Sequence, residues 1–172
     1  MKKYIVILVI VLGTLVTGCQ KDETTGLEYL QSGQYEEAII KFEEHTDDKQ
    51  NQAEAYRGIG LAYWELEDYQ RARAAFEKAL SYGTEETGTI CNFMGICDMK
   101  LGYFESAQEW FEKGIGIEGN AEELTKEMMF NQIVACEEIG DWDQAKEKLA
   151  DYTARYPDDS EAKKEADFLE TR

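Results

Sequence analysis

Few residues in this sequence are of types that could do chemistry. His45 is the only histidine, so a histidine-based triad has one possible position, and no serine on a nucleophile turn lies near it. Residues 114–119 read G-I-G-I-E-G and fit the pattern that cradles a pyrophosphate, but that pattern must follow a strand. Here it follows a predicted helix, which glycine would end. The sequence contains no calcium loop, zinc spacing or phosphate loop, so we predict no catalytic residues, no metal and no cofactor.

The cysteines after residue 19 are Cys91, Cys97 and Cys136. At about 1.5 Å of rise per residue, Cys91 and Cys97 lie about 9 Å apart along one helix, which is too far for a disulfide. Cys97 and Cys136 fall on successive first helices of the repeats described below, so a disulfide between them stays open. We expect three buried thiols that serve as small core residues.

The N-terminus has the order of a signal peptide. Residues 1–3 carry two lysines, residues 4–16 are largely apolar, and small residues precede Cys19. The apolar stretch is shorter than the roughly 20 residues that cross a bilayer, although an uncleaved anchor remains an alternative. The pattern resembles the bacterial lipobox, which implies a signal peptide at 1–18, lipid on Cys19 and a short tether over 19–25. We therefore expect a lipid-anchored protein on the extracytoplasmic face of the cell membrane, or on the periplasmic side of an envelope membrane.

The charge of the chain restricts its partners. The formal net charge is −18, and loss of residues 1–18 removes two lysines and no acids, leaving −20. Nucleic acid is excluded as a partner because phosphate binding needs a basic stripe. Acidic pairs such as Glu36-Glu37 fall on helix faces that meet water, and such acidity is typical of a soluble surface.

A repeat of about 34 residues organises the rest of the chain. Four blocks are anchored on Ala38, Ala72, Ala107 and Ala145, at spacings of 34, 35 and 38. An aromatic residue stands three before each alanine and a large apolar residue four after it. Five before it lies a turn residue, and twelve before it a glycine in the first three blocks. These positions are held, in that order, by Tyr35, Tyr69, Phe104 and Trp142; Phe42, Phe76, Phe111 and Leu149; Gly33, Glu67-Asp68, Gly102 and Gly140; and Gly26, Gly60 and Gly95.

Each block therefore predicts a helix, a tight turn and a second helix, with the glycine of the first helix facing the alanine of the second. The spacings strongly resemble the tetratricopeptide repeat, and Pro157, twelve after Ala145, matches its terminal proline. The resemblance implies an all-α, right-handed α-solenoid with four repeats over 26–157. Two departures are Asp98, in place of an aromatic, and a first helix in the last block that is about four residues longer. Residues 158–172 predict a capping helix with an apolar stripe at Ala162, Ala166 and Leu169.

In such a solenoid the first helices line the concave side, and their residues outside the repeat pattern should face the groove. By helical phase we predict a partner-binding groove formed by Arg57, Leu61, Trp64, Asn92, Phe93, Ile96, Met99, Phe130, Asn131 and Val134. Most are apolar. Tetratricopeptide domains that clamp a terminal carboxylate use lysines and asparagines, and here only Asn92 and Asn131 are similar. An extended or helical protein segment is therefore the expected occupant.

Three occupants remain open: a foreign protein or peptide, the chain's own last helix with Phe168 in the groove, or a second copy in a homodimer. The chain resembles repeat lipoproteins of envelope assembly, such as those serving outer-membrane barrel insertion or pilus secretin assembly. This implies a membrane-anchored interaction scaffold and no enzyme. The alternative is an extracytoplasmic module that binds or senses a peptide or glycan.

Overall fold

The computed structural model describes residues 23–172. The predicted signal peptide at 1–18 and the lipid site at Cys19 lie outside these residues. In the described part every regular element is an α-helix, which confirms the prediction of an α-solenoid built from helical repeats. The contacts divide it into an N-terminal unit, residues 23–86, and a C-terminal unit, residues 87–172, each of which is described by itself. None of the described helices is long and apolar enough to span a membrane.

The N-terminal unit consists of two helical hairpins. Short turns join the helices within each hairpin, and α3 packs on both α2 and α4. The helices are α1 (Glu23–Gln31), α2 (Tyr35–Glu43), α3 (Gln52–Glu65) and α4 (Tyr69–Ser81).

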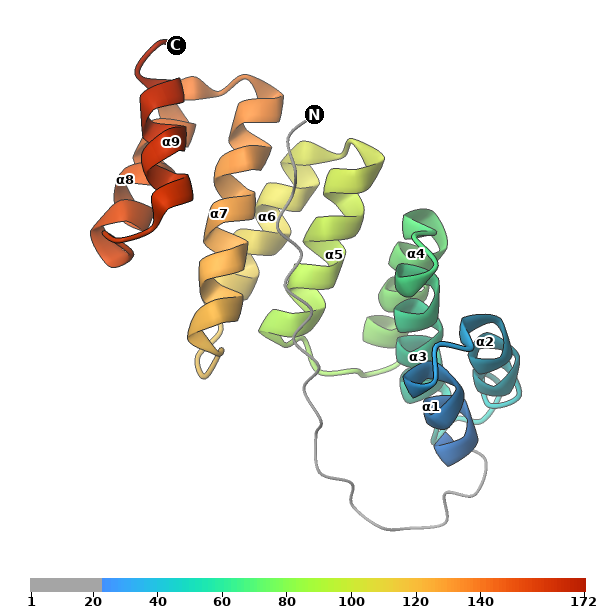
Figure 1. Ribbon diagram of the computed structural model, residues 1–172. Helices are drawn as coiled ribbons and strands as arrows, with labels where there is room; N and C mark the ends of the chain where they lie inside the picture. The colour runs from blue at the N-terminus through green and yellow to red at the C-terminus, as the bar shows by residue number, and fades with distance from the viewer. Residues whose placement is uncertain (1–22) are drawn as a thin grey trace. The chain divides into compact units, whose positions relative to one another are not determined.

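The C-terminal unit adds two further hairpins and one last helix. Figure 1 shows its helices following one another side by side, and both α6 and α5 contact α7. The helices are α5 (Gly88–Leu101), α6 (Phe104–Ile115), α7 (Glu122–Ile139), α8 (Trp142–Arg155) and α9 (Ser160–Leu169).

The turn within each hairpin contains one residue in the left-handed region of backbone space. Gly33, Gly102 and Gly140 adopt φ values of 75°, 79° and 83° at the position five before the repeat alanine. The second hairpin places Glu67 there with φ 58°, the one positive φ of a non-glycine residue in the described chain. Glycine adopts this conformation without a Cβ clash, whereas another L-residue is strained by about 1–2 kcal/mol. The predicted turns are confirmed, including the glutamate that replaces glycine.

In the first three hairpins, the glycine of the first helix leaves room for an aromatic ring of the second helix. A Cβ on Gly60 would lie 2.6 Å from the ring of Phe76, and one on Gly95 would lie 2.5 Å from the ring of Phe111. The ring four residues after the repeat alanine therefore fills the space beside the glycine. The alanine is itself fully buried and shares a helix face with that ring, because residues i and i+4 lie on one face. That the glycine faces the alanine stays a prediction.

The last hairpin departs from this packing. It carries Ile133 where the others have glycine and Leu149 where they have phenylalanine, and both are buried with Cys136 and Tyr152 in one cluster. Its first helix α7 has 18 residues, against 14 for α3 and α5, which confirms the predicted extension of about four. The added turn lies at the N-terminal end of α7, where it carries Glu123.

Helix α9 packs on the last hairpin. Its N-cap is Asp159, whose side chain accepts hydrogen bonds from the backbone N–H groups of Glu161 and Ala162. Ala162 and Leu169 are buried in the cluster of the last hairpin, as the apolar stripe predicts. Phe168 packs edge-to-face on Trp142 of α8, with ring centroids 6.3 Å apart. The alternative in which Phe168 fills the groove is therefore not the arrangement seen, because α8 provides its aromatic partner.

Candidate partner-binding site

Three of the predicted groove residues follow one face of α3 in the N-terminal unit. Arg57 is partly exposed and pairs with Glu54, its Nε lying 2.9 Å from the carboxylate. Leu61 is half-buried, whereas Trp64 is only 9% exposed. Arg57 and Leu61 therefore offer surface to a partner, and Trp64 mainly supports the unit from within.

The C-terminal unit uses several of the other predicted groove residues as core. Ile96, Met99 and Val134 are each 5–6% exposed and lie in one cluster between α5, α6 and α7. Helical phase could not foresee this burial, because successive first helices pack directly on each other and the flanking positions are taken up in that contact. Phe93 is half-buried, as is Phe130 at the edge of the cluster. Whether these residues contact a partner stays a prediction.

Three polar side chains are buried between α5 and α7. Asn92, Glu127 and Asn131 are 7%, 7% and 5% exposed. Asn92 donates from Nδ2 to Oε1 of Glu127 over 3.2 Å. Burial raises the pKa of Glu127, and this hydrogen bond opposes the rise only in part. The chain thus keeps polar groups where an ordinary repeat core would be apolar. Burying them lowers the free energy of unfolding unless they form hydrogen bonds.

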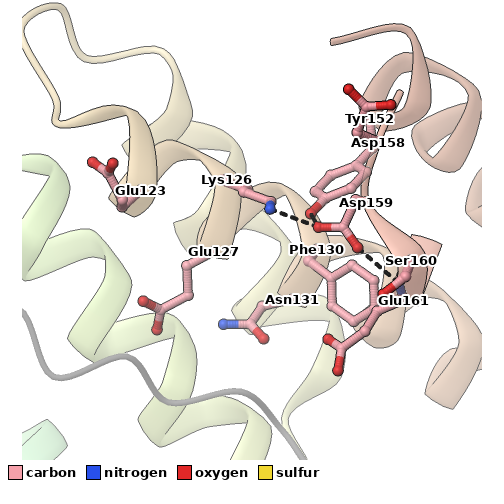
Figure 2. A pocket seen from close by; sticks show the side chains of 10 residues that line it. All are labelled: Glu123, Lys126, Glu127, Phe130, Asn131, Tyr152, Asp158, Asp159, Ser160 and Glu161. Atoms are coloured by element: carbon pink, nitrogen blue, oxygen red, sulfur yellow. Dashed lines mark hydrogen bonds and ion pairs between the residues drawn. The ribbon is translucent and has the colours of Figure 1, made fainter. Parts of the chain in front are cut away.

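Two of these side chains, Glu127 and Asn131, open into a pocket with a volume of about 480 Å³ (Figure 2). Its floor and one wall come from α7, on residues that share a helix face. The facing wall comes from Tyr152 of α8 and from the segment that leads into α9. The lining residues are Glu123, Lys126, Glu127, Phe130, Asn131, Tyr152, Asp158, Asp159, Ser160 and Glu161.

Asp159 holds the facing wall in place. Its Oδ2 lies 2.6 Å from Nζ of Lys126 and accepts a hydrogen bond of 3.0 Å from the Tyr152 hydroxyl, while Oδ1 caps α9 (Figure 2). Burial alone would raise the pKa of Asp159, but the bonds from Lys126, from two backbone amides and from Tyr152 outweigh it and lower the pKa to about 2. The Tyr152 pKa is raised by burial and by this carboxylate. Asp159 therefore joins α7, α8 and α9 as a fixed anion.

The pocket carries an excess of negative charge. Five carboxylates line it against the single ammonium group of Lys126, which is already bound to Asp159. The half-buried Phe130 adds an aromatic surface, and its ring lies edge-on to that of Tyr152, which is only 2% exposed, with centroids 5.6 Å apart. Such a surface suits a group that is cationic at its end and apolar along its length.

Sequence reasoning identified Phe130 and Asn131 of this pocket and missed the other residues that line it. Glu127, one turn before Asn131, appeared as one more acid on a helix face. Asp159 and Glu161 appeared as the start of a capping helix. The signal that could have found the pocket was the added turn of α7, because a longer first helix must extend past its partner and meet the next segment.

The glycine motif, the cysteines and His45, which the sequence offered as candidates for chemistry, have structural positions in the fold. Gly114 is buried within α6, and Gly119, at φ 85°, lies in the turn that follows, so residues 114–119 end a helix as predicted. Cys91, Cys97 and Cys136 are all buried, and the structure forms no disulfide between described cysteines. Burial raises the pKa of the Cys136 thiol, which keeps it protonated. His45 lies half-buried in the turn after α2. No group of metal-ligating side chains occurs within residues 23–172.

Comparison with family models assigns the helical hairpins. Three models, each described as tetratricopeptide repeat, match residues 24–86, 89–120 and 127–159, which together make up most of the chain. The chain is a tetratricopeptide-repeat protein. Repeats of this family are generally non-enzymatic scaffolds for protein or peptide partners. This tetratricopeptide-repeat protein has the helical hairpins of the family. A comparison with curated proteins gives no match.

Several solved structures are similar to it in fold. The crystal structure of YrrB, a TPR protein with an unusual peptide-binding site, is 24% identical with a TM-score of 0.69, over 80% of this chain and 68% of that one. A MamA RS-1 double mutant is 19% identical with a TM-score of 0.73, over 87% and 82%. PilF of Pseudomonas aeruginosa is 17% identical with a TM-score of 0.63, over 82% and 62%. At these identities the similarity shows the fold alone.

Proposed function

We propose that this tetratricopeptide-repeat protein is a membrane-anchored, extracytoplasmic scaffold that binds a segment of a partner protein along the first helices of its repeats, in the assembly of the cell envelope. The observation that carries the proposal is the pocket on α7, where half-buried aromatic and buried polar side chains lie together on a first helix. Core packing alone favours apolar residues at such positions, so buried amides and a buried carboxylate there favour a binding role.

Two of the predicted groove residues on first helices keep part of their surface exposed. Leu61 on α3 and Phe93 on α5 are half-buried apolar residues beside buried neighbours. On the second helices, Ala74 of α4 and Glu109 of α6 are exposed and serve as comparison positions, while Ile40 of α2 is 58% exposed. Partly exposed apolar side chains are typical of binding surfaces for peptides.

The membrane anchor is supported by the residues around Cys19. If Cys19 carries lipid, Cys19→Ala should abolish incorporation of labelled palmitate and move the protein from the membrane fraction to the soluble fraction. A matched change at Cys91, which is buried in the C-terminal unit, should leave both unchanged provided the variant folds. Retention of the lipid label in Cys19→Ala would contradict the anchor.

The partner can be sought by photo-crosslinking in intact cells. A photoreactive amino acid at Leu61 or Phe93 should yield a discrete product with a second protein, and the same group at Ala74 or Glu109 should not. Products from all four positions would indicate random collisions and contradict a binding face. A product at twice the mass of the chain would assign the face to a second copy and overturn the foreign partner.

A further inference from the structure

The pocket between α7 and α9 has features that ordinary core packing does not explain. Asn92 of α5 does not line the pocket, but it donates to the lining residue Glu127 and leaves its own Oδ1 buried without a hydrogen-bond donor among the described residues. Asn131 is 5% exposed and lines the pocket, and Figure 2 shows no hydrogen bond from its amide to any other lining residue. The Asn131 amide atoms are not among the buried side-chain atoms of the described chain that lack a partner, so they are open to the pocket. The Asn131 amide is therefore placed to bond to something that enters the pocket.

The charges of the pocket point to the sign of that group. Glu127, Glu123 and Glu161 line the pocket, and none of them has a described cation as an ion-pair partner. Lys126 is held by Asp159 at 2.6 Å, so the one ammonium group does not neutralise the α7 carboxylates. The field in the pocket is therefore negative, which favours a cation.

The spacing of these carboxylates points to the shape of the cation. The acids of the described chain form no cluster tight enough to hold a metal ion. Instead, Glu127 lies beside Asn131, and the half-buried Phe130 ring lies next to them, backed by the buried Tyr152 (Figure 2). A flexible chain with an apolar stem and a charged end matches this order, since the stem covers the Phe130 ring while the end meets the carboxylates.

We infer that the pocket receives a lysine or arginine side chain presented by the partner segment. The stem lies on the half-buried Phe130 ring, the charged end binds the Glu127 carboxylate, and the Asn131 side-chain oxygen accepts a further N–H bond. This inference rests on the proposed function and adds the chemistry of the partner: a basic residue carried on an otherwise extended or helical segment. The wall formed by Asp159 and Lys126 sets the far limit of the pocket and is not replaced on binding.

The test uses the purified full chain with isotope-labelled nitrogen and three small probes. N-acetyl-lysine methylamide and N-acetyl-arginine methylamide carry the cation, and N-acetyl-norleucine methylamide has a similar stem without it. We expect the two cationic probes to shift the side-chain amide signal of Asn131 in a saturable way, and the neutral probe to bind about tenfold more weakly. Equal binding of all three probes, or no shift from any, would overturn the inference.

Two variants keep the test independent of folding. Glu127→Gln keeps the volume and can still accept from Asn92, so it should fold normally and bind the cationic probes about tenfold more weakly. Glu161→Gln, at the exposed rim, should weaken binding by a smaller factor, and Glu147→Gln on the exposed face of α8 is the matched control with the same change of charge. Equal affinity in Glu127→Gln and Glu147→Gln would contradict a role for the pocket.

The two proposals can fail separately. Position-specific crosslinks from Leu61 and Phe93, with no response of Asn131 to the cationic probes, would support the scaffold proposal. The same result would contradict the inference that the partner inserts a basic residue. Saturable binding of the cationic probes without any crosslinked product in cells would establish the cation pocket and overturn the scaffold.

Discussion

The third and fourth hairpins of the chain follow the same pattern of helix and turn but differ in what lies between their helices. In the α5–α6 hairpin, Gly95 allows the ring of Phe111 to lie against the backbone of the first helix. In the α7–α8 hairpin, Ile133 and Leu149 occupy the equivalent positions, and Tyr152 and Phe130 meet instead one turn further along. The regular hairpin has a tight ring-to-backbone contact and a buried Asp98 that accepts a hydrogen bond from Ser106, whereas the irregular one has a pocket at its edge.

This difference indicates how a repeat array acquires a site. Glycine and a large ring form a close, fully apolar contact that leaves no room for a ligand. Where the pattern is relaxed and the first helix gains a turn, Glu123 of that turn lines the pocket together with the start of α9. Asp159 joins this segment to α7 through Lys126 and to α8 through Tyr152. The close glycine-to-ring contact and the candidate site therefore lie in different hairpins of the unit.

The largest effect is expected from a substitution that disrupts the packing of the α5–α6 hairpin. Gly95→Val places branched carbons where a single Cβ already lies 2.5 Å from the Phe111 ring, so we expect a loss of about 3 kcal/mol in the free energy of unfolding. Ile133→Val creates the same residue at the equivalent position of the irregular hairpin and should cost about 1 kcal/mol. Urea unfolding followed by circular dichroism measures both. Similar losses would show that the two hairpins are packed alike.

The second prediction removes the anion that closes the irregular hairpin. Asp159→Asn keeps the N-cap of α9 but loses the charge that binds Lys126, so we expect a loss of about 2 kcal/mol at neutral pH. Asp158→Asn, at the neighbouring exposed residue, is the matched control and should change stability by less than about 0.5 kcal/mol.

The same variant has a defined pH dependence. The Asp159 pKa is lowered from 3.8 to about 2 in the folded chain, so the carboxylate contributes its full stability above pH 4 and loses it as the pH falls toward about 2. The difference in unfolding free energy between the unmodified chain and Asp159→Asn should therefore shrink over that interval. A difference that stays constant down to pH 2 would show that the ion pair does not stabilise the fold.

The smallest effects concern the turns. Glu67→Gly relieves the strain of a positive φ and should stabilise the N-terminal unit by about 0.5–1 kcal/mol. Gly102→Ala introduces the same kind of strain in the third hairpin, where nothing lies within 4 Å of an added Cβ, and should cost about 1 kcal/mol. Thermal unfolding of both variants provides the comparison. Opposite signs are expected, and a shared sign would contradict the strain at Glu67.

Local patterns in the sequence predicted the hairpins because the turn, small and aromatic positions of a hairpin all depend on residues close together in the chain. The spacing of small and aromatic residues predicted four helix pairs, and the spacing of 38 predicted the longer α7. The burial of Ile96 and Val134 was not predictable, since helical phase shows which residues share a face and not whether that face meets water or another helix. The pocket was missed because it depends on Asp159 and Glu127, which only the packing of α9 brings together.

The most direct test of the account asks whether partner binding is concentrated at the irregular hairpin. A photoreactive amino acid at Ser160, which is exposed at the rim of the pocket and uncharged, can be compared in intact cells with and without Glu127→Gln. The account predicts a discrete product from Ser160 that falls strongly in Glu127→Gln and persists in Glu147→Gln. An equal yield in all three backgrounds would contradict recognition of a basic partner residue by this pocket.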